Sequence, residues 1–418
     1  MSGLQARQSE LSIELARHQT ATTEFERPEQ ELSGRIGARA NQPDLICHVL
    51  PRGMRFSQSR ATSIDLYVCE LVAYSRQSSV VIAEEIADPL PAPRLIEIPC
   101  YNYARTTRRS RFIARKIAEL DPTIVSVQQH IPSAVHITSL VQQPVILQRH
   151  NFLERPADDN VFSRYRYRSK IAKLNALGGI TFVSDVLVSH FESHWPDVQV
   201  PREVISNGFD KRLWQAHPDR DNSILIVGRA APEKGIAEAA AAVATVLADK
   251  PEWRADFVLS EEAVHPDYHK SIKRLLEPLG RQVSLRLNRP FAEVKRLFER
   301  AAIAIVPSKW AEPFGRTCLE AHAGGAAVIS SGTGGLRSIS GDQALYIDPA
   351  NPRSIAQALK FLMNDDDARQ ALAKGGTERV CRLFDIDVIA ARLDKFCSSV
   401  SAGRSHLSHV DPPSLGNR

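Results

Sequence analysis

The chain has 418 residues, of which 43% are hydrophobic and 24% are charged, and a chain of this size can bury two ordinary cores. Lysine and arginine exceed aspartate and glutamate by 53 − 48 = 5, and neither zinc-ligand spacing nor an RNA-binding aromatic motif accompanies this mild excess, so no nucleic-acid partner is expected. Six scattered cysteines without CxxC spacing indicate free thiols in a reducing compartment. The sequence shows no signal-peptide core and no run of about 18 apolar residues, which predicts a soluble, cytoplasmic protein.

The first organised part of the chain is expected at residues 44–210. Residues 1–43 are polar and lack a sustained apolar stripe, which predicts a mobile N-terminal arm. From residue 44 onward, short apolar runs alternate with helical or loop segments, a pattern typical of a parallel, doubly wound sheet. The predicted strands of this first Rossmann-like domain are residues 45–50, 80–82, 95–98, 124–127, 145–147 and 180–183.

A second series of the same kind follows a polar linker at residues 211–222 and is expected to form a second Rossmann-like domain, residues 223–385. Residues 386–403 have helical spacing and are expected to pack back on the first domain, ahead of a tail at 404–418. The fold class is therefore α/β, with two doubly wound domains facing across a cleft at the carboxyl ends of their strands. The predicted strands of the second series are residues 224–227, 257–259, 283–287, 303–306 and 327–329.

Residues 303–325 (IAIVPSKWAEPFGRTCLEAHAGG) read as a strand, a loop and the start of a helix. Pro313 biases Glu312 away from helical dihedrals, whereas Glu320 lies inside the helical pattern. The two carboxylates are therefore not a pair on one helical face. A glycine-bearing loop that runs into a helix presents free N–H groups and the positive end of the helix dipole, which suits a phosphate or a polar sugar.

A basic loop directly follows the first predicted strand of the second domain, with the sequence GRAAPEKG in residues 228–235. Arg229 offers a fork that binds two oxygens, and Lys234 offers a compact point charge, so both are natural partners of a diphosphate. Read alone, the loop is equally consistent with an ordinary basic helix start.

Read together, these stretches resemble a known family. GRAAPEKG is followed about 80 residues later by PSKWAEPFGRTCLEAHAGGAAVISS and then by GTGGL, and this order resembles the carboxyl-terminal domain of the family 4 glycosyltransferases, retaining enzymes of the GT-B architecture. The E-x7-E element from Glu312 to Glu320 is the most specific part of the match. The resemblance is strong over residues 207–349 and weaker through the first domain.

The resemblance implies a role for each matching residue. It implies that Arg229 and Lys234 hold the diphosphate of a nucleotide-sugar donor, with Gly228 also at the donor. It further implies that Glu320 holds the ribose and that Glu312 holds the sugar. The remaining implied donor contacts are the backbone at Phe314, Gly315, Arg316 and Thr317, with Gly53 against the donor phosphate. His150 would match a histidine near the transferred sugar.

Two positions depart from the family pattern. The first loop has one glycine, Gly53, where the family commonly has two, and Arg337 stands where the family often has a glutamate. For His150 a structural role remains an open alternative, and for His130 the structural role is favoured.

The residue types agree with sugar transfer. Breaking a bond between a sugar and a diphosphate builds negative charge on the leaving phosphate, which Arg229 and Lys234 would stabilise. Retaining glycosidases use two carboxylates about 5 Å apart, and nothing in the spacing of Glu312 and Glu320 indicates such a pair, so both are interpreted as substrate-orienting groups. No Asp-x-Asp element lies in the motif loops, and neither a metal nor another cofactor is expected.

The sequence thus predicts a retaining glycosyltransferase that moves a sugar from a nucleotide-diphosphate sugar to a glycan or glycolipid acceptor, in bacterial cell-surface polysaccharide or lipopolysaccharide synthesis. The alternatives are another GT-B enzyme, a phosphorylase or a sugar-nucleotide epimerase, and a non-catalytic nucleotide-sugar binding protein. Two basic runs with interleaved aromatic residues, 101–116 and 162–173, suggest contact with anionic lipid at the inner face of the plasma membrane. The alternative for these runs is a solvated helix face.

Overall fold

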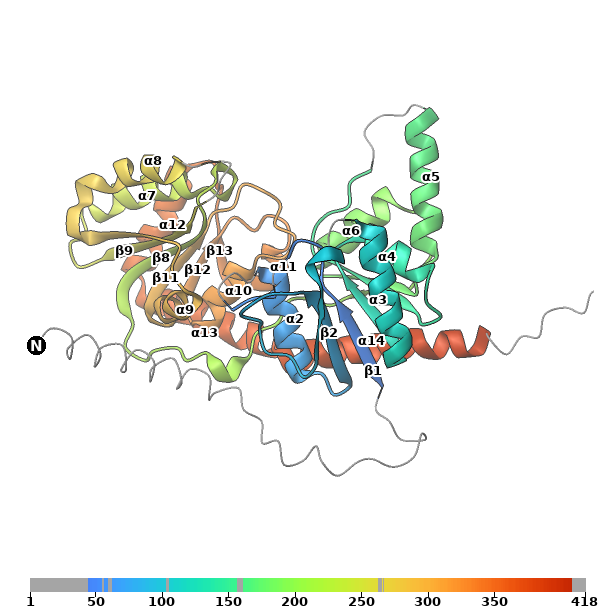
Figure 1. The fold of residues 1–418 in the computed structure, drawn as a ribbon. Helices are drawn as coiled ribbons and strands as arrows, with labels where there is room; N and C mark the ends of the chain where they lie inside the picture. The colour runs from blue at the N-terminus through green and yellow to red at the C-terminus, as the bar shows by residue number, and fades with distance from the viewer. Residues whose placement is uncertain are drawn as a thin grey trace, which may run out of the picture. The chain divides into compact units, whose positions relative to one another are not determined.

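The computed structural model describes residues 44–407, apart from residues 55, 59–61, 103–104, 156–160, 262–264 and 266 (Figure 1). The predicted N-terminal arm and residues 408–418 of the predicted tail lie outside this part of the chain. The described residues form two parallel β-sheets, each flanked by helices, which confirms the predicted α/β class with two doubly wound Rossmann-like domains.

The first sheet has seven strands in the order β3-β2-β1-β4-β5-β6-β7, and every neighbouring pair is parallel. Because the chain builds outward from β1 and then returns to its other side with β4, the order reverses between these two strands. The strands are β1 (Leu45–Val49), β2 (Ser78–Glu84), β3 (Leu95–Ile98), β4 (Ile124–Gln128), β5 (Val145–Arg149), β6 (Gly179–Phe182) and β7 (Arg202–Val204). The helices are α2 (Ser63–Tyr74), η3 (Cys100–Asn102), α3 (Thr106–Leu120), α4 (Ile131–Thr138), α5 (Val161–Asn175) and α6 (Asp185–His194).

The second sheet has six strands in the order β10-β9-β8-β11-β12-β13, again all parallel, and its order reverses between β8 and β11. The strands are β8 (Asp221–Arg229), β9 (Arg254–Ser260), β10 (Val283–Leu287), β11 (Ala301–Val306), β12 (Ala327–Ser330) and β13 (Ala344–Tyr346). The helices of this part are η4 (Lys211–Leu213), η5 (Pro232–Lys234), α7 (Ile236–Leu247), α8 (Tyr268–Leu276), η6 (Glu277–Gln282), α9 (Phe291–Arg300), α10 (Arg316–Ala323), α11 (Leu336–Ser340), α12 (Pro352–Asn364) and α13 (Asp366–Leu383).

Local sequence explains why these elements form. The central strands are continuous apolar runs, as expected where both faces of a parallel sheet are covered, and β11 is buried along its whole length. Helix α2 begins at a capping box, in which the Thr62 side chain accepts from the Asp65 N–H and the Asp65 side chain accepts from the Thr62 N–H. Alanine-rich α7 has a high helix propensity and packs its buried face into the second core.

The last described helix, α14 (Ile386–Leu407), returns to the first domain, as the sequence predicts. Its residues Ile389, Leu393 and Phe396 belong to one buried cluster with Ile46 of β1 and Tyr67 of α2. The Asp394 carboxylate accepts from Ser75 Oγ at 2.7 Å and from the Arg76 N–H at 2.8 Å. The helix runs to residue 407, beyond the predicted end at 403.

Three details of the sheets differ from the prediction. Strands β7 and β13 were not predicted; each has only three residues and lies at the edge of its sheet. Strand β8 begins at Asp221, inside the predicted linker, because Asp221 pairs with Ala301 of β11 and its carboxylate accepts from Arg300 at 3.1 Å. No helix in the described part of the chain is both long enough and apolar enough to span a lipid bilayer.

Candidate functional site

A cavity of about 530 Å³ lies at the carboxyl ends of the strands, where ligands bind in open α/β sheets. Its wall in the second domain follows the ends of β8, β9, β10 and β11, and so includes the point where the strand order reverses. Its wall in the first domain includes the start of α2, the residues after β5 and Asn207. Of the predicted site residues, those that line it are His150, Gly228, Arg229, Lys234, Glu312, Phe314, Gly315, Arg316 and Thr317.

The basic loop after β8 is held against the loop after β11. The Glu233 carbonyl accepts from the Lys309 N–H at 2.8 Å and from the Trp310 N–H at 3.3 Å. Gly235 has φ +67°, and a Cβ at this position would lie 2.0 Å from the Pro307 carbonyl oxygen. Only glycine fits this approach, so the close packing of the two loops fixes where Lys234 stands.

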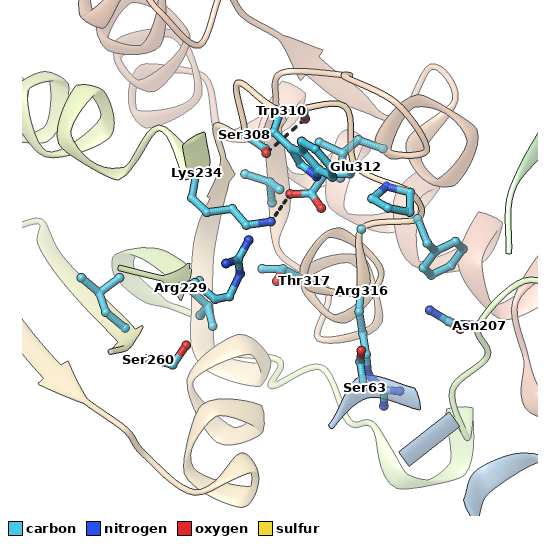
Figure 2. Close-up of a pocket in the computed structure, with 18 of the residues that line it drawn as sticks. Ser63, Asn207, Arg229, Lys234, Ser260, Ser308, Trp310, Glu312, Arg316 and Thr317 are labelled. Atoms are coloured by element: carbon cyan, nitrogen blue, oxygen red, sulfur yellow. Dashed lines mark hydrogen bonds and ion pairs between the residues drawn. The ribbon is translucent and has the colours of Figure 1, made fainter. Parts of the chain in front are cut away.

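Lys234 and Glu312 form an ion pair, with Nζ 2.5 Å from Oε1 (Figure 2). Both side chains are mostly buried, at 17% and 13% exposure. Glu312 lies outside helical structure, directly before Pro313, as the sequence predicts. The pair links the two motifs across 78 positions of sequence, and each charge compensates the other in the protein without a ligand.

Arg229 stands at the end of β8 and points into the same part of the cavity (Figure 2). Its guanidinium lies 3.2 Å from Glu233 Oε1, four positions on, and its side chain is 45% exposed. An exposed pair of this kind contributes little stability. The Arg229 side chain is thus part of the cavity wall and about half exposed.

Two helices begin at the cavity, one in each domain. Ser63 and Ile64 open α2, while Arg316 and Thr317 open α10. Gly315, with φ +107°, precedes α10, and a Cβ there would lie 2.3 Å from Leu336 Cδ2. Helix N-termini offer N–H groups and a positive partial charge. The start of α10 has no side-chain cap and suits an anionic group, whereas the start of α2 is closed by the Thr62–Asp65 capping box.

The Arg316 side chain bridges two carboxylates. It donates to Glu70 of α2 at 3.0 Å and to Glu320 of α10 at 2.9 Å. Burial disfavours the charge of Arg316, but the carboxylates of Glu70 and Glu320 outweigh it, so the pKa of Arg316 is raised. Burial raises the pKa of Glu320, and the Arg316 charge opposes this. Glu320 lies behind Arg316 and is not among the residues that line the cavity.

The two remaining predicted residues lie in the first domain. His150 lines the cavity and is almost fully buried, with Nε2 2.9 Å from Gln128 Oε1 and its ring edge-on to Tyr67. Burial, and then the charge of Arg149, lowers the pKa of His150 to about 3, so the imidazole is neutral near pH 7. Gly53, with φ +78°, is not part of the lining, and its N–H donates to the Glu84 carboxylate at 3.2 Å.

His130 has the structural role that the sequence favours. Its Nδ1 accepts from the Ser133 N–H and so caps α4. Arg337, the second departure from the family pattern, lies over the ring of Tyr346 at 4.1 Å from the ring centre.

Several lining residues were missed from the sequence. Ser63, Asn207, Ser260 and Trp310 also face the cavity (Figure 2). Ser260 could have been found, because it directly follows the predicted strand 257–259, at the carboxyl end where the site was expected. Ser63 and Asn207 come from distant segments of the chain and carry no motif of their own.

The sequence similarity to known proteins is strongest in the second domain. Residues 210–379 match the family model of Glycosyl transferases group 1. The chain is 29% identical over 198 residues to glycogen synthase of Mycobacterium tuberculosis (strain CDC 1551 / Oshkosh), which covers 45% of this chain and 46% of that protein. It is 28% identical over 221 residues to D-inositol 3-phosphate glycosyltransferase of Corynebacterium glutamicum (strain R), which covers 48% and 52%. The chain thus spans about half the length of the curated relatives it matches.

Solved structures share the whole fold. Sucrose-phosphate synthase from Thermosynechococcus elongatus superposes with a TM-score of 0.68 at 19% identity, covering 86% of this chain and 100% of that one. Anabaena HepE in complex with UDP and glucose gives a TM-score of 0.66 at 16% identity, covering 85% and 100%. These likenesses show that the described chain has the GT-B architecture.

Proposed function

We propose that this protein is a retaining glycosyltransferase of family 4 that transfers a sugar from a nucleotide-diphosphate sugar to a glycan or glycolipid acceptor. One observation carries the proposal: a cavity at the reversal of strand order gathers four basic side chains, the Glu312 carboxylate and the N-terminus of α10. The match of residues 210–379 to a glycosyltransferase model and the UDP bound to Anabaena HepE support a nucleotide donor.

In the proposed reaction, the bond between the sugar and the diphosphate breaks and negative charge develops on the leaving phosphate. Arg229 and the Lys234 ammonium would stabilise this charge, aided by the N–H groups at the start of α10. At about 4 Å and an effective dielectric of about 20, one such charge pair is worth on the order of 4 kcal/mol before desolvation. An effect of this size changes a rate strongly.

The two glutamates orient the donor in this proposal. Glu312 accepts a hydrogen bond from the Lys234 ammonium. When Lys234 turns to the phosphate, Glu312 would accept hydrogen bonds from the sugar hydroxyls instead. Glu320 would reach the ribose only if Arg316 moved aside, because Glu320 lies behind Arg316 and does not line the cavity. As placed, it keeps Arg316 in position through their 2.9 Å hydrogen bond. Because only Glu312 lines the cavity, the two carboxylates do not flank one sugar as a glycosidase pair does. The same-face attack that retention requires would then use the leaving phosphate as the proton acceptor.

The acceptor would enter from the first domain, and we place it in bacterial cell-surface polysaccharide or lipopolysaccharide synthesis at the inner face of the plasma membrane. Helix α5 supports contact with an anionic membrane. Its aromatic side chains Phe162 and Tyr165 are 82% and 73% exposed. Exposed basic residues accompany them, namely Arg164, Arg166, Arg168 and Lys173.

The test has two stages. Purified protein is first screened for thermal stabilisation by a panel of nucleotide sugars, because a ligand that binds the folded state raises the melting temperature. The stabilising donor is then incubated with and without candidate acceptors, and products are identified with the configuration of the new bond. Retained configuration and an absolute need for acceptor are expected. Conversion of the donor without acceptor would instead identify an epimerase, and binding without turnover a non-catalytic protein.

The proposed transfer uses no metal at the diphosphate, since Arg229 and Lys234 supply the positive charge. Product formation should therefore persist in excess EDTA. Loss of turnover that Mg²⁺ or Mn²⁺ restores would overturn this part of the proposal.

A further inference from the structure

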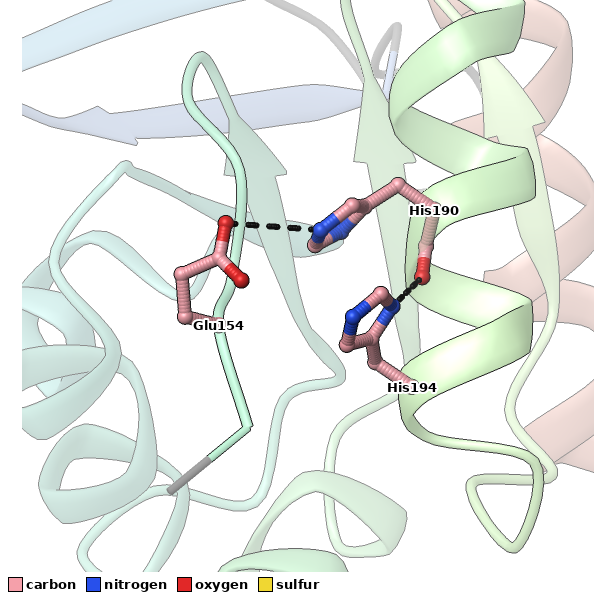
Figure 3. A group of neighbouring side chains, drawn as sticks. All are labelled: Glu154, His190 and His194. Atoms are coloured by element: carbon pink, nitrogen blue, oxygen red, sulfur yellow. Dashed lines mark hydrogen bonds and ion pairs between the residues drawn. The ribbon is translucent and has the colours of Figure 1, made fainter. Parts of the chain in front are cut away.

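Three side chains with metal-ligating atoms meet on α6 and on the segment that follows β5 (Figure 3). His190 and His194 are four positions apart on α6, so both imidazoles leave the same face of the helix. Glu154 faces them from the other segment, and one ligand atom from each residue lies within 4.8 Å of the others. We propose that these residues bind one divalent transition-metal ion of the Zn²⁺ class.

The donor set selects this class of ion. Two imidazole nitrogens and one carboxylate oxygen suit Zn²⁺ and its neighbours, whereas Mg²⁺ and Ca²⁺ prefer oxygen ligands alone. Glu154 Oε1 lies 3.3 Å from His190 Nε2. Ligands at about 2.0–2.1 Å from a tetrahedral ion lie about 3.4 Å from one another, so this edge of the polyhedron is already formed. A fourth position would remain for water.

An independent observation concerns the tautomer of His194. Its Nδ1 lies 2.8 Å from the His190 carbonyl oxygen and 2.9 Å from Ser193 Oγ (Figure 3). A carbonyl oxygen only accepts, so Nδ1 carries the proton, and the lone pair of Nε2 is left for a ligand bond. Metal-binding histidines are commonly fixed in this way by a backbone carbonyl behind the ring.

His190 meets Phe152 edge-on, with 4.9 Å between ring centres. Its ring also stacks on His194, with 3.9 Å between ring centres and 16° between the ring planes. Because an ion lies close to the plane of each imidazole that binds it, one of the two rings must rotate when the ion binds. A simple ion pair between His190 and Glu154 is the plainer interpretation. However, the Glu154 side chain is 71% exposed, and exposed pairs contribute little. An ion pair also leaves the orientation of His194 unexplained, whereas a metal ion uses all three side chains.

The ion would stiffen one wall of the cavity. Glu154 closes a segment that begins with the lining residues His150 and Asn151. Between them, Phe152 meets the lining residue Trp310 edge-on, with ring centres 6.4 Å apart. A metal bond from Glu154 to α6 would therefore restrain the backbone that presents His150, without any contact between the ion and the substrate.

The test uses untagged, full-length protein stripped with EDTA and dialysed against Zn²⁺. Elemental analysis should find one ion per chain, and competition with a chelating dye should give its affinity. His194→Ala and Glu154→Gln should each weaken binding at least tenfold. Zn²⁺, but not Mg²⁺, should raise the melting temperature of the wild type and leave that of His194→Ala unchanged.

Two matched controls exclude background sites. Glu192→Gln removes a carboxylate from the same helix, and Cys100→Ser removes an exposed thiol; both should bind Zn²⁺ like the wild type. Co²⁺ should give the visible absorption of a tetrahedral site without a thiolate band. Circular dichroism establishes that each variant is folded. The proposal is overturned if stripped wild-type protein takes up no ion, or if folded His194→Ala binds it with unchanged affinity.

Discussion

At the scale of single residues, Lys234 carries the largest expected effect on transfer. Its ammonium lies in the cavity, is mostly buried and is held by Glu312 at 2.5 Å. Lys234→Ala removes the positive charge that would stabilise the leaving phosphate, so kcat/KM should fall well over tenfold. Steady-state kinetics with the donor identified by the screen measures the effect.

The control for Lys234→Ala must separate chemistry from folding, because the substitution leaves Glu312 without its partner. Lys234→Arg keeps the charge and should recover part of the activity, while the remote Lys250→Ala should behave as the wild type. Full turnover by a correctly folded Lys234→Ala protein would refute the assignment of this site.

Three buried histidines make stability depend on pH. Burial lowers the pKa of His48 to about 4, and burial followed by a nearby arginine lowers the pKa values of His150 and His322 to about 3. An unfolded histidine titrates near 6.5, so above that pH both states are neutral and the stability is complete. As the pH falls below 6.5, these histidines bind protons in the unfolded state but not in the folded state. Stability is then lost progressively until the pH reaches the folded values.

The expected loss is about 1.4 kcal/mol per pH unit for each histidine. Denaturant unfolding at pH 7, 6 and 5 measures the slope. His48→Leu is the informative variant, because both ring nitrogens of His48 are buried with no hydrogen-bond partner among the described residues. The unfolding free energy of His48→Leu should depend less steeply on pH, by the uptake of about one proton on unfolding. A pH dependence equal to that of the wild type would contradict the prediction.

At the scale of elements, the loop from β8 to α7 depends on the backbone of Gly235. Gly235→Ala should lower the free energy of unfolding by more than about 2 kcal/mol, because left-handed backbone costs a non-glycine residue about 1–2 kcal/mol and the new Cβ also meets the Pro307 carbonyl. Urea unfolding midpoints measure the change.

Gly53→Ala is the control for the Gly235 prediction. Gly53 has φ +78°, close to the +67° of Gly235, yet no heavy atom lies within 4 Å of a Cβ placed there. Gly53→Ala therefore carries the cost of a positive φ without the collision and should destabilise less than Gly235→Ala. Equal losses would mean that the packing of the two loops does not matter.

The same elements show how far sequence reasoning reaches. The central strands were predictable because buried parallel strands are long apolar runs, and Pro313 and Gly315 correctly separated the loop from α10. Strands β7 and β13 were not predictable, since a three-residue edge strand is defined by its pairing with the neighbouring strand rather than by its own residues.

The candidate site was predictable to the extent that its residues follow strands. Arg229, Lys234 and Glu312 were found because motif loops at strand ends converge in this architecture. The ion pair between Lys234 and Glu312 and the bridge from Arg316 to Glu70 were not found. Both join positions far apart in the chain, and only the three-dimensional packing determines which side chains meet.

At the scale of the whole molecule, the excess of five positive charges is small, so any membrane affinity must come from where the charges lie. Helix α5 gathers four exposed basic side chains and two exposed aromatic rings. The protein should sediment with liposomes that contain anionic lipid and remain in solution with neutral ones. The replacement of Arg164, Arg166 and Arg168 by glutamine should remove most of this binding, since each basic residue near an anionic surface contributes about 1 kcal/mol.

A matched variant separates the position of the charges from their number. Helix α8 carries three exposed basic residues in the second domain, so replacing Lys270, Lys273 and Arg274 by glutamine changes the net charge equally. If α5 is the contact, the α8 variant should sediment like the wild type, and high salt should release both proteins. Equal loss of liposome binding in the two variants would show that binding depends on net charge alone. Negligible binding of the wild type to either kind of liposome would leave α5 as a solvated helix and move the acceptor search to water-soluble glycans.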